Sequence, residues 1–342
     1  MTAELLASPA AAGAFGVMDA TLTGRGRPRQ GPGGIRPPAP PAQAPAHVAM
    51  VRPHRFTVNL ATAADNAYQR AAVETPDAAR LAYEQSSRLA EALAAAGVGV
   101  SLFDDEHGLS PDSVFPNNWF TTHPAGQVVL CPMYAQNRRQ ERRGDVVEHL
   151  RAAFQVSQVV DLSAAEEAGQ FLEGTGAVVI DHAGGLAYGC RSHRLSQELF
   201  QHYCRLLGLE PVLFDAADAA GKPVFHTNIM LSVGENVVLI GSELIRDPAQ
   251  RAAVLERLRE SGRTVVELTE TQIRGFAGNA LQLTGDDGPV LAMSITARAV
   301  LRPDQAEAIR RSSQILSADV STIEASGGSV RCMLAGIHLP PR

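Results

Sequence analysis

The stretch GTGAVVIDHAGGLAYGC, residues 174–190, carries the pattern that decides the fold. Apolar residues run through AVVI, a glycine-rich turn follows, and LAYGC returns as a second apolar strand, as in a β-hairpin. Three further stretches repeat this plan: NNWFTTHPAGQVVLCPM at 117–133, HTNIMLSVGENVVLIGS at 226–242 and GNALQLTGDDGPVLAMS at 278–294. A unit repeated along the chain in this way is typical of folds built from copies of one supersecondary motif.

Each hairpin is followed by a helical period and then by a short strand. The periodicity predicts helices at residues 138–154, 193–207, 248–261 and 303–316. The strands after them are expected at QVVDL, PVLFDA, TVVELT and VSTIEAS. A fifth unit has its helix at 76–95 and the strand VGVSLFDD. Its hairpin is divided between HVAMVRP and RCMLAGIHL, near the two ends of the chain, with Cys332 at the start of the closing strand.

Five ββαβ units spaced about 50 residues apart predict an α/β fold, a five-bladed propeller with a central channel. A doubly wound parallel sheet is the competing α/β arrangement, but it has single strands where this sequence has hairpins. In a ring, the same position of every unit faces the channel. Polar residues stand at that position, at the start of the aligned hairpins: Asn117, Asn118, Glu173, His226, Asn228 and Asn279.

Composition separates the chain into two parts. Of the 342 residues, 45% are hydrophobic and 19% are charged, which is close to the globular average. Residues 1–46 differ, because proline-rich runs such as GIRPPAPPAQAPA bury too little apolar surface to offset the entropy of ordering the chain. We expect a disordered N-terminal extension over 1–46, or a start of translation near Met50, and a single catalytic domain over 47–342.

Charge and cysteine usage narrow the class of partner. The formal net charge of −6 argues against nucleic acid or an anionic membrane as the main partner, and no apolar run is long enough to span a bilayer. The four cysteines form no CxxC pair, which disfavours a zinc site and a disulfide framework and indicates a reducing compartment. We expect a cytoplasmic protein that binds a small molecule, and leave open whether it forms a homo-oligomer.

Four motifs, in the order of the repeats, resemble one known superfamily: DSVFPNNWF, FLEGTGAVVID, FHTNIM and GGSVRCMLAGIHL. They resemble the penteins, the guanidino-group-modifying fold of arginine deiminases, dimethylarginine hydrolases and amidinotransferases. The resemblance covers residues 47–342. It is strongest to the amidinotransferase-related branch that includes bacterial citrulline hydrolases, and it implies catalytic roles for Cys332, His226 and Glu173.

These residue types suit attack on a guanidinium or ureido carbon. That carbon is a poor electrophile, so a thiolate, which is a strong nucleophile, suits the role of Cys332. A histidine that titrates near neutral pH can give a proton to the leaving nitrogen and later take one from water, as expected of His226. A carboxylate such as Glu173 can hold that histidine or the substrate nitrogens.

Departures from the family pattern bear on the substrate. Arginine deiminases carry an aspartate where this chain has Asn228, and an Arg-Asp pair where it has Asn117 and Asn118. An amide offers a donor and an acceptor without charge, which suits a neutral ureido group. Asp112 could restore one acid. We expect L-citrulline as the substrate, converted to ornithine, ammonia and carbon dioxide and bound by these four side chains. Arginine deiminase, dimethylarginine hydrolase and amidinotransferase activities are the alternatives.

The remaining expectations concern binding groups. The segment YGCRSHRL follows the second hairpin, where related enzymes place a substrate-binding arginine; Arg194 matches best and Arg191 is the second choice. No metal or cofactor is expected, because a thiolate supplies the nucleophile, and GTGAVVID lacks the Walker lysine. We expect Cys131, Cys190 and Cys204 to be structural and His338 to lie at the surface. A non-enzymatic binding module, as in a ribosome-binding translation factor with the same ring, would not need the Cys-His-Glu set.

Overall fold

The computed structural model describes residues 41–63, 66–69, 77–108 and 110–342. These residues contain five small sheets, with helices around them. The predicted extension over 1–46 lies mainly outside the described residues and stays a prediction. Gln43, near its end, is buried, and its Nε2 donates to the carbonyl oxygens of Ile180 and Val233.

We call each three-stranded sheet, together with the helices next to its strands along the chain, a blade. Blade 1 has β15 (Ala335–Ile337), β1 (His47–Pro53), α1 (Ala78–Ala95) and β2 (Gly99–Asp105). Blade 2 has β3 (Phe120–Thr122), β4 (Gln127–Leu130), α2 (Gly144–Ala153) and β5 (Gln158–Asp161). Blade 3 has α3 (Gly174–Ala177), β6 (Val178–Asp181), β7 (Leu186–Cys190), α4 (Gln197–Leu207) and β8 (Glu210–Phe214). Blade 4 has β9 (Leu231–Val233), β10 (Val237–Ile240), α5 (Pro248–Glu260), β11 (Thr264–Glu267) and α6 (Glu270–Arg274). Blade 5 has β12 (Leu281–Gly285), β13 (Gly288–Ser294), α7 (Ile295–Ala299), α8 (Pro303–Arg310), β14 (Gln314–Ala318), α9 (Ser321–Glu324) and α10 (Val330–Met333).

Short 3₁₀ turns complete the described secondary structure. They are Leu60–Thr62, Pro116–Asn118, Gln136–Glu141, Ser163–Ala168, Thr227–Ile229 and Ser242–Leu244.

One pairing pattern recurs in all five blades. The first strand pairs antiparallel with the second, and the second pairs parallel with the third. A tight turn can join the antiparallel pair, whereas the parallel pair needs a crossover, which is usually a helix. In blade 4 this helix is α5, which starts with Pro248 after the N-cap Asp247, whose side chain accepts from the backbone N–H of Gln250.

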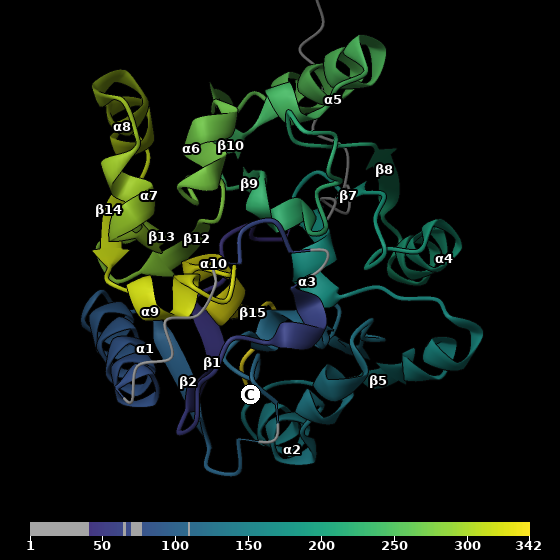
Figure 1. The fold of residues 1–342 in the computed structure, drawn as a ribbon, viewed down its shortest axis with the longest axis vertical. Coiled ribbons are helices and arrows are strands. Elements are labelled where there is room, and N and C mark those ends of the chain that lie inside the picture. Colours follow the sequence, from purple (N-terminus) through teal and green to yellow (C-terminus); the bar gives the residue numbers. More distant parts are fainter. Residues whose placement is uncertain (1–40, 64–65, 70–76, 109) are drawn as a thin grey trace, which may run out of the picture. The chain divides into compact units, whose positions relative to one another are not determined.

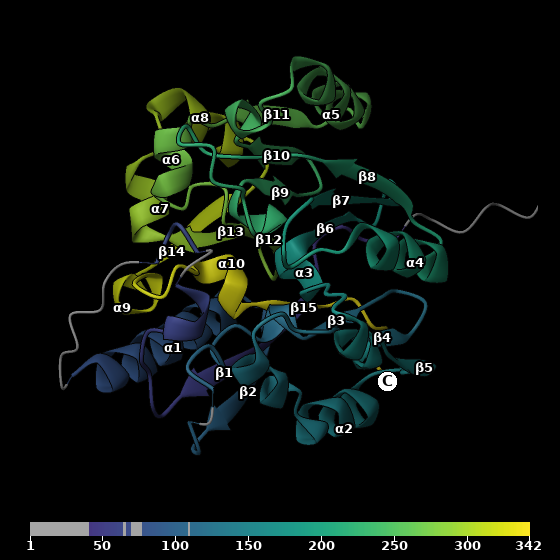
Figure 2. The same ribbon diagram turned by 45° about the vertical axis from the view of Figure 1, so that its right-hand side comes forward.

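The blades follow one another around a common centre (Figure 1). Their first strands lie innermost, and β15 contacts β3, β6 contacts β9, and β9 contacts β12. The long helices α1, α2, α4, α5 and α8 lie on the outside in both views, whereas α10 lies at the centre (Figures 1 and 2). Blade 1 is closed by β15, whose Ile337 pairs with His47 of β1. The predicted five-bladed α/β propeller is confirmed, including its split hairpin.

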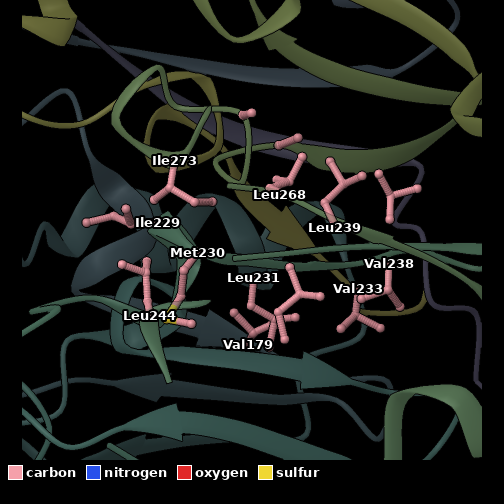
Figure 3. Close-up of a cluster of buried hydrophobic side chains, with 14 of the residues drawn as sticks. Val179, Ile229, Met230, Leu231, Val233, Val238, Leu239, Leu244, Leu268 and Ile273 are labelled. Atoms are coloured by element: carbon pink, nitrogen blue, oxygen red, sulfur yellow. The ribbon is translucent and has the colours of Figure 1, made fainter. Parts of the chain in front are cut away.

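A cluster of buried aliphatic side chains joins blades 3 and 4 (Figure 3). Val179 of β6 lies beside Leu231 of β9, and Ile273 of α6 covers the cluster from the other side. These three side chains are at most 1% exposed. Burial of such a side chain stabilises the fold by about 1.5–3 kcal/mol, so neighbouring blades depend on each other for stability.

Several predicted boundaries were wrong. The last strand of blade 5 is β14, Gln314–Ala318, whereas VSTIEAS forms α9. Helix α8 ends at Arg310 because Ser312 and Ser313 turn the chain back, with both backbone N–H groups bonded to the carbonyl of Ile309. The predicted helix at 138–154 begins only at Gly144, after the 3₁₀ turn Gln136–Glu141. Cys332 lies in α10, two residues after its start, rather than in the closing strand.

Replacing Ile337 in the closing strand with alanine should lower the free energy of unfolding by about 2–5 kcal/mol, because this side chain is 3% exposed and packs in the core between blades 1 and 2. The matched control is Ile295→Ala, where the side chain is 47% exposed, and the expected change is within about 0.5 kcal/mol. Denaturant unfolding of both variants measures the difference. Equal losses would show that β15 adds little to the stability of the ring.

Candidate active site

Glu173 is fully buried in front of α3. Its Oε1 accepts from the backbone N–H of Tyr134 at 3.0 Å, and its Oε2 lies 2.8 Å from His226 Nε2 and 3.4 Å from Arg194 Nη1. Burial raises the pKa of Glu173, but Arg194, His226 and Arg138 outweigh burial, so the pKa lies well below its usual range. Glu173 is therefore a fixed negative charge.

His226 is buried at the start of the turn Thr227–Ile229. A carboxylate only accepts hydrogen bonds, so the contact with Glu173 assigns the proton to Nε2 and leaves Nδ1 as an acceptor. Burial lowers the pKa of His226; Glu173 raises it, but burial, helped by Arg194 and Arg138, outweighs that, and the pKa lies below the usual value. His226 is thus a neutral base at pH 7.

Cys332 lines the same pocket as His226 and is 4% exposed. Two amides contact its sulfur: Asn279 Nδ2 lies 3.2 Å and Asn228 Nδ2 lies 3.5 Å from Sγ. Asn279 Nδ2 also donates to the carbonyl oxygen of Asn228 at 3.2 Å. The sulfur therefore receives N–H donors from uncharged side chains, which favour a developing thiolate.

A strained turn positions Asn279. Phe276 has a φ of 63°, a left-handed conformation that is costly for a bulky side chain. Its carbonyl accepts from the backbone N–H of Asn279 at 2.9 Å, which closes the turn. The sequence identified Asn279 only as a channel residue, and the structure brings its amide against Sγ.

The turn Pro116–Asn118 brings two further amides to the pocket region. Asn118 Nδ2 donates to Asn117 Oδ1 at 3.0 Å, and Asn118 Oδ1 accepts from Arg138 Nη1 at 2.9 Å. Arg138 is 2% exposed, and its Nε and Nη2 donate to Glu141 at 2.9 and 2.8 Å. Sequence reasoning missed Arg138, because nothing in the sequence distinguishes it from the neighbouring arginines of NRRQERR.

Asp112 is buried and lines the pocket. Its Oδ2 accepts from Asn59 Nδ2 at 2.7 Å and lies 3.6 Å from Arg138 Nε. Its Oδ1 is buried with no hydrogen-bond partner among the described residues. Asp112 is therefore already paired with one arginine, while one of its oxygens stays open for a donor.

Of the two candidate arginines, only Arg194 reaches the pocket. It is 2% exposed, and its guanidinium carbon lies 4.5 Å from the centre of the Phe225 ring. Arg191 is exposed and pairs with Asp215 at 3.0 Å. The substrate-binding role expected of Arg194 stays a prediction.

The other thiols lie in the hydrophobic core. Cys131, Cys190 and Cys204 are at most 1% exposed, and burial raises their pKa values to about 12, 11 and 12. A thiol with so high a pKa is a poor nucleophile at neutral pH. Among the residues described, no group of three or more His, Cys, Asp and Glu side chains could hold a metal ion.

Glycines allow these segments to meet. Gly174 has a φ of +44°, and a Cβ there would lie 2.4 Å from the carbonyl oxygen of Asn117. A Cβ on Gly176 would lie 2.3 Å from Asn118 Nδ2 and 2.9 Å from the His226 ring. The motif GTG therefore lets α3 pack directly against the turns of blades 2 and 4. The pocket has a cavity volume of about 20 Å³ and combines a thiol, a neutral imidazole and a fixed carboxylate, which suits covalent catalysis.

A five-bladed ring of ββαβ units with a cysteine, a histidine and a glutamate at its centre defines the pentein class of guanidino-group-modifying enzymes. Within this class, residues 52–339 match the family described as eukaryotic N,N-dimethylarginine dimethylhydrolase, and the chain belongs to this family. The chemistry of that family is hydrolysis of a guanidino carbon–nitrogen bond. A search of curated proteins finds no match.

Solved structures share the fold at low sequence identity. ArgZ, an arginine dihydrolase from the ornithine-ammonia cycle in cyanobacteria, is 18% identical over 84% of this chain, with a TM-score of 0.66; the match spans 40% of the ArgZ chain. The N-terminal domain of ArgZ, in a cysteine-to-serine variant bound to substrate, is 17% identical over 86% of this chain and 98% of its own length, with a TM-score of 0.66. A dimethylarginine dimethylaminohydrolase adduct with 4-chloro-2-hydroxymethylpyridine is 17% identical over 84% of this chain and 98% of its own, with a TM-score of 0.58.

Within the described ranges, no helix has both the length and the apolar character needed to cross a bilayer.

Replacing Gly176 with alanine should lower kcat/KM by about 100-fold, because the new Cβ displaces Asn118 and His226, and misplacement by about 1 Å can have that effect. The overpacking should also lower the free energy of unfolding by about 1–3 kcal/mol. The control is Gly144→Ala, since no atom lies within 4 Å of a Cβ at Gly144. Unchanged turnover in Gly176→Ala would mean that this contact does not position the site.

Proposed function

We propose that the protein is a cysteine-dependent hydrolase of a ureido or guanidino amino acid, and that its substrate is L-citrulline. The observation that carries the choice of substrate is the set of amides around the nucleophile: Asn228 and Asn279 both contact Sγ. A neutral ureido group has N–H donors and an acceptor oxygen, which amides can match without surplus charge.

Charge pairing in the pocket supports the same choice. The two carboxylates that line or border it, Glu173 and Asp112, are each already close to an arginine, at 3.4 Å from Arg194 and 3.6 Å from Arg138. A guanidinium substrate would have to compete with these arginines, whereas a neutral group would not. The same arginine, Arg194, is our candidate for binding the substrate α-carboxylate, since arginine forms bidentate pairs with carboxylates.

The proposed reaction has two stages. Sγ of Cys332 attacks the ureido carbon while its proton passes to Nδ1 of His226, and Glu173 stabilises the imidazolium that forms. A carbon–nitrogen bond then breaks as His226 returns the proton to the leaving nitrogen. Water, deprotonated by His226, attacks the adduct and breaks the carbon–sulfur bond, and the proton returns to sulfur, which regenerates the thiol. The carbamic acid that is released then breaks its remaining carbon–nitrogen bond and gives carbon dioxide and the second amine. The products are ornithine, ammonia and carbon dioxide.

One observation favours an arginine-type substrate as the second candidate. The unpartnered Oδ1 of Asp112 could accept an N–H of a guanidinium. The family is described by dimethylarginine hydrolysis, and ArgZ by arginine dihydrolysis.

The test offers purified protein L-citrulline, L-arginine and dimethylarginine separately and measures ornithine, ammonia and dimethylamine. We expect ornithine from citrulline, and a fall of about 10⁴-fold or more in Cys332→Ala, because the nucleophile is lost. Cys204→Ala is the matched control and should keep its turnover.

The other outcomes identify the rivals. Citrulline or ornithine from arginine, with no turnover of added citrulline, would favour arginine chemistry and assign the missing acid to Asp112. Dimethylamine would assign dimethylarginine hydrolysis. Product formation only when an acceptor amine is present would assign amidino transfer, and no turnover of any substrate by folded protein would contradict an enzymatic role.

The pH dependence of kcat/KM should fall on the acid side with an apparent pKa below 6.5, because burial and the two arginines lower the pKa of His226 and the base must be neutral. Glu173→Gln removes the group that raises this pKa, so the acid limb of the residual activity should move to still lower pH. A limb that stays in place or moves to higher pH would exclude His226 as the base.

A further inference from the structure

Arg331, next to the nucleophile, is a buried cation without a buried anion. It is 6% exposed, its Nη1 donates to the carbonyl oxygen of Ala280 at 3.3 Å, and its Nε has no partner among the described residues. Burial lowers its pKa to about 10, so it stays protonated at neutral pH. Other deeply buried arginines do have a buried carboxylate partner: Arg138 pairs with Glu141, and Arg263 pairs with Asp181.

An unpaired buried charge is costly, and proteins normally supply a partner for it. No carboxylate in the described part of the chain forms an ion pair with Arg331. Among the described residues, Cys332 is the one whose charge raises the pKa of Arg331. An anion bound from outside the described residues would supply this partner.

The guanidinium lines a second pocket, which shares no residue with the one that contains Cys332. All five innermost strands contribute to its lining, and Gln43 lies beside it. The second pocket has a cavity volume of about 40 Å³. Arg331 and Cys332 thus face different pockets from adjacent positions of α10.

Histidines supply the other polar groups of this pocket. His182 and His338 line it, and their ring centres lie 3.9 Å apart; the ring of His123 is 5.9 Å from that of His182. The prediction that His338 lies at the surface was wrong, since its ring packs at a tilt against the ring of His182 and the residue is only partly exposed. Burial lowers the pKa values of His182 and His123 to about 4 and 3, so both are neutral and each carries one N–H donor.

We propose that the second pocket binds a small planar monoanion of the carboxylate or carbonate type, held by Arg331 and by N–H groups of His338 and His182. One fixed cation requires one negative charge. A guanidinium presents its N–H groups in a planar fork whose geometry matches two oxygens of a planar oxyanion. The site is separate from the proposed catalysis and does not depend on which substrate is hydrolysed.

The test measures thermal unfolding of the full chain in HEPES buffer at pH 7.5, with sodium formate or sodium bicarbonate added, and with sodium chloride at equal ionic strength. Formate and bicarbonate should raise Tm saturably, by about 5 °C at ~100-fold excess over Kd, and chloride should not. Calorimetric titration with formate should give one site per chain.

Arg331→Met should abolish the response, and Arg310→Met, an exposed arginine in α8, should keep it. In HEPES alone Arg331→Met should melt at or above the wild-type temperature, because it removes an uncompensated buried charge. If Arg331→Met does not fold, Arg331→Lys tests the same point. Lysine keeps the positive charge but cannot bind two oxygens at once as a guanidinium does, so the Kd for formate should rise at least about 10-fold.

Three results would overturn the proposal. They are no saturable rise in the wild type, an equal rise in Arg331→Met, and an equal rise with chloride, which would show a general salt effect or a site for spherical ions.

Discussion

The buried carboxylate of Glu173 is the interaction on which the centre of this molecule depends. It receives a backbone N–H from the loop after β4, an imidazole from blade 4 and an arginine from the segment before α4. Removing one partner of such a buried group typically costs 3–5 kcal/mol, about a third or more of the stability of an ordinary domain. The group that sets the tautomer of His226 therefore also ties three segments together.

The repeat explains how so many polar groups can be buried without collapse of the site. Each blade presents a short turn at the entrance of its innermost strand, and these turns come from sequence positions as distant as Asn118 and Cys332. The backbone carbonyls of these turns are not all bonded to neighbouring strands, so side chains such as Asn279 and Thr227 donate hydrogen bonds to them. The amide of Asn279 bonds the carbonyl of Asn228, and the hydroxyl of Thr227 donates to the carbonyl of Ala177.

Local patterns account for what the sequence predicted well. Alternating apolar residues and turn residues predict the hairpins. The two halves of the split hairpin were identified because both are apolar and the fifth unit has no continuous hairpin of its own. The resemblance then pointed to Glu173, His226 and Cys332, which lie together in the structure. Their catalytic roles remain part of the proposal.

What the sequence could not predict depends on contacts between distant segments. Arg138 is one of several arginines in a charged run, and only the fold shows that it is buried between Glu141 and Asn118. The end of α8 was missed because the helical period continues past Arg310, while two serines redirect the backbone. His338 looked like a surface residue because it follows the final strand, and its ring contacts His182, which belongs to another blade.

The pairing of β15 with β1 has a consequence for the timing of assembly. Residues 47 and 337 must meet before the ring closes, a sequence separation that makes this one of the slowest contacts for a folding chain to form. The helix that carries Cys332 ends two residues before β15 begins, so the pocket that Cys332 and His226 line is complete only when closure occurs. In an open intermediate Cys332 is separated from His226 and Glu173, and the pocket is assembled with the last long-range contact.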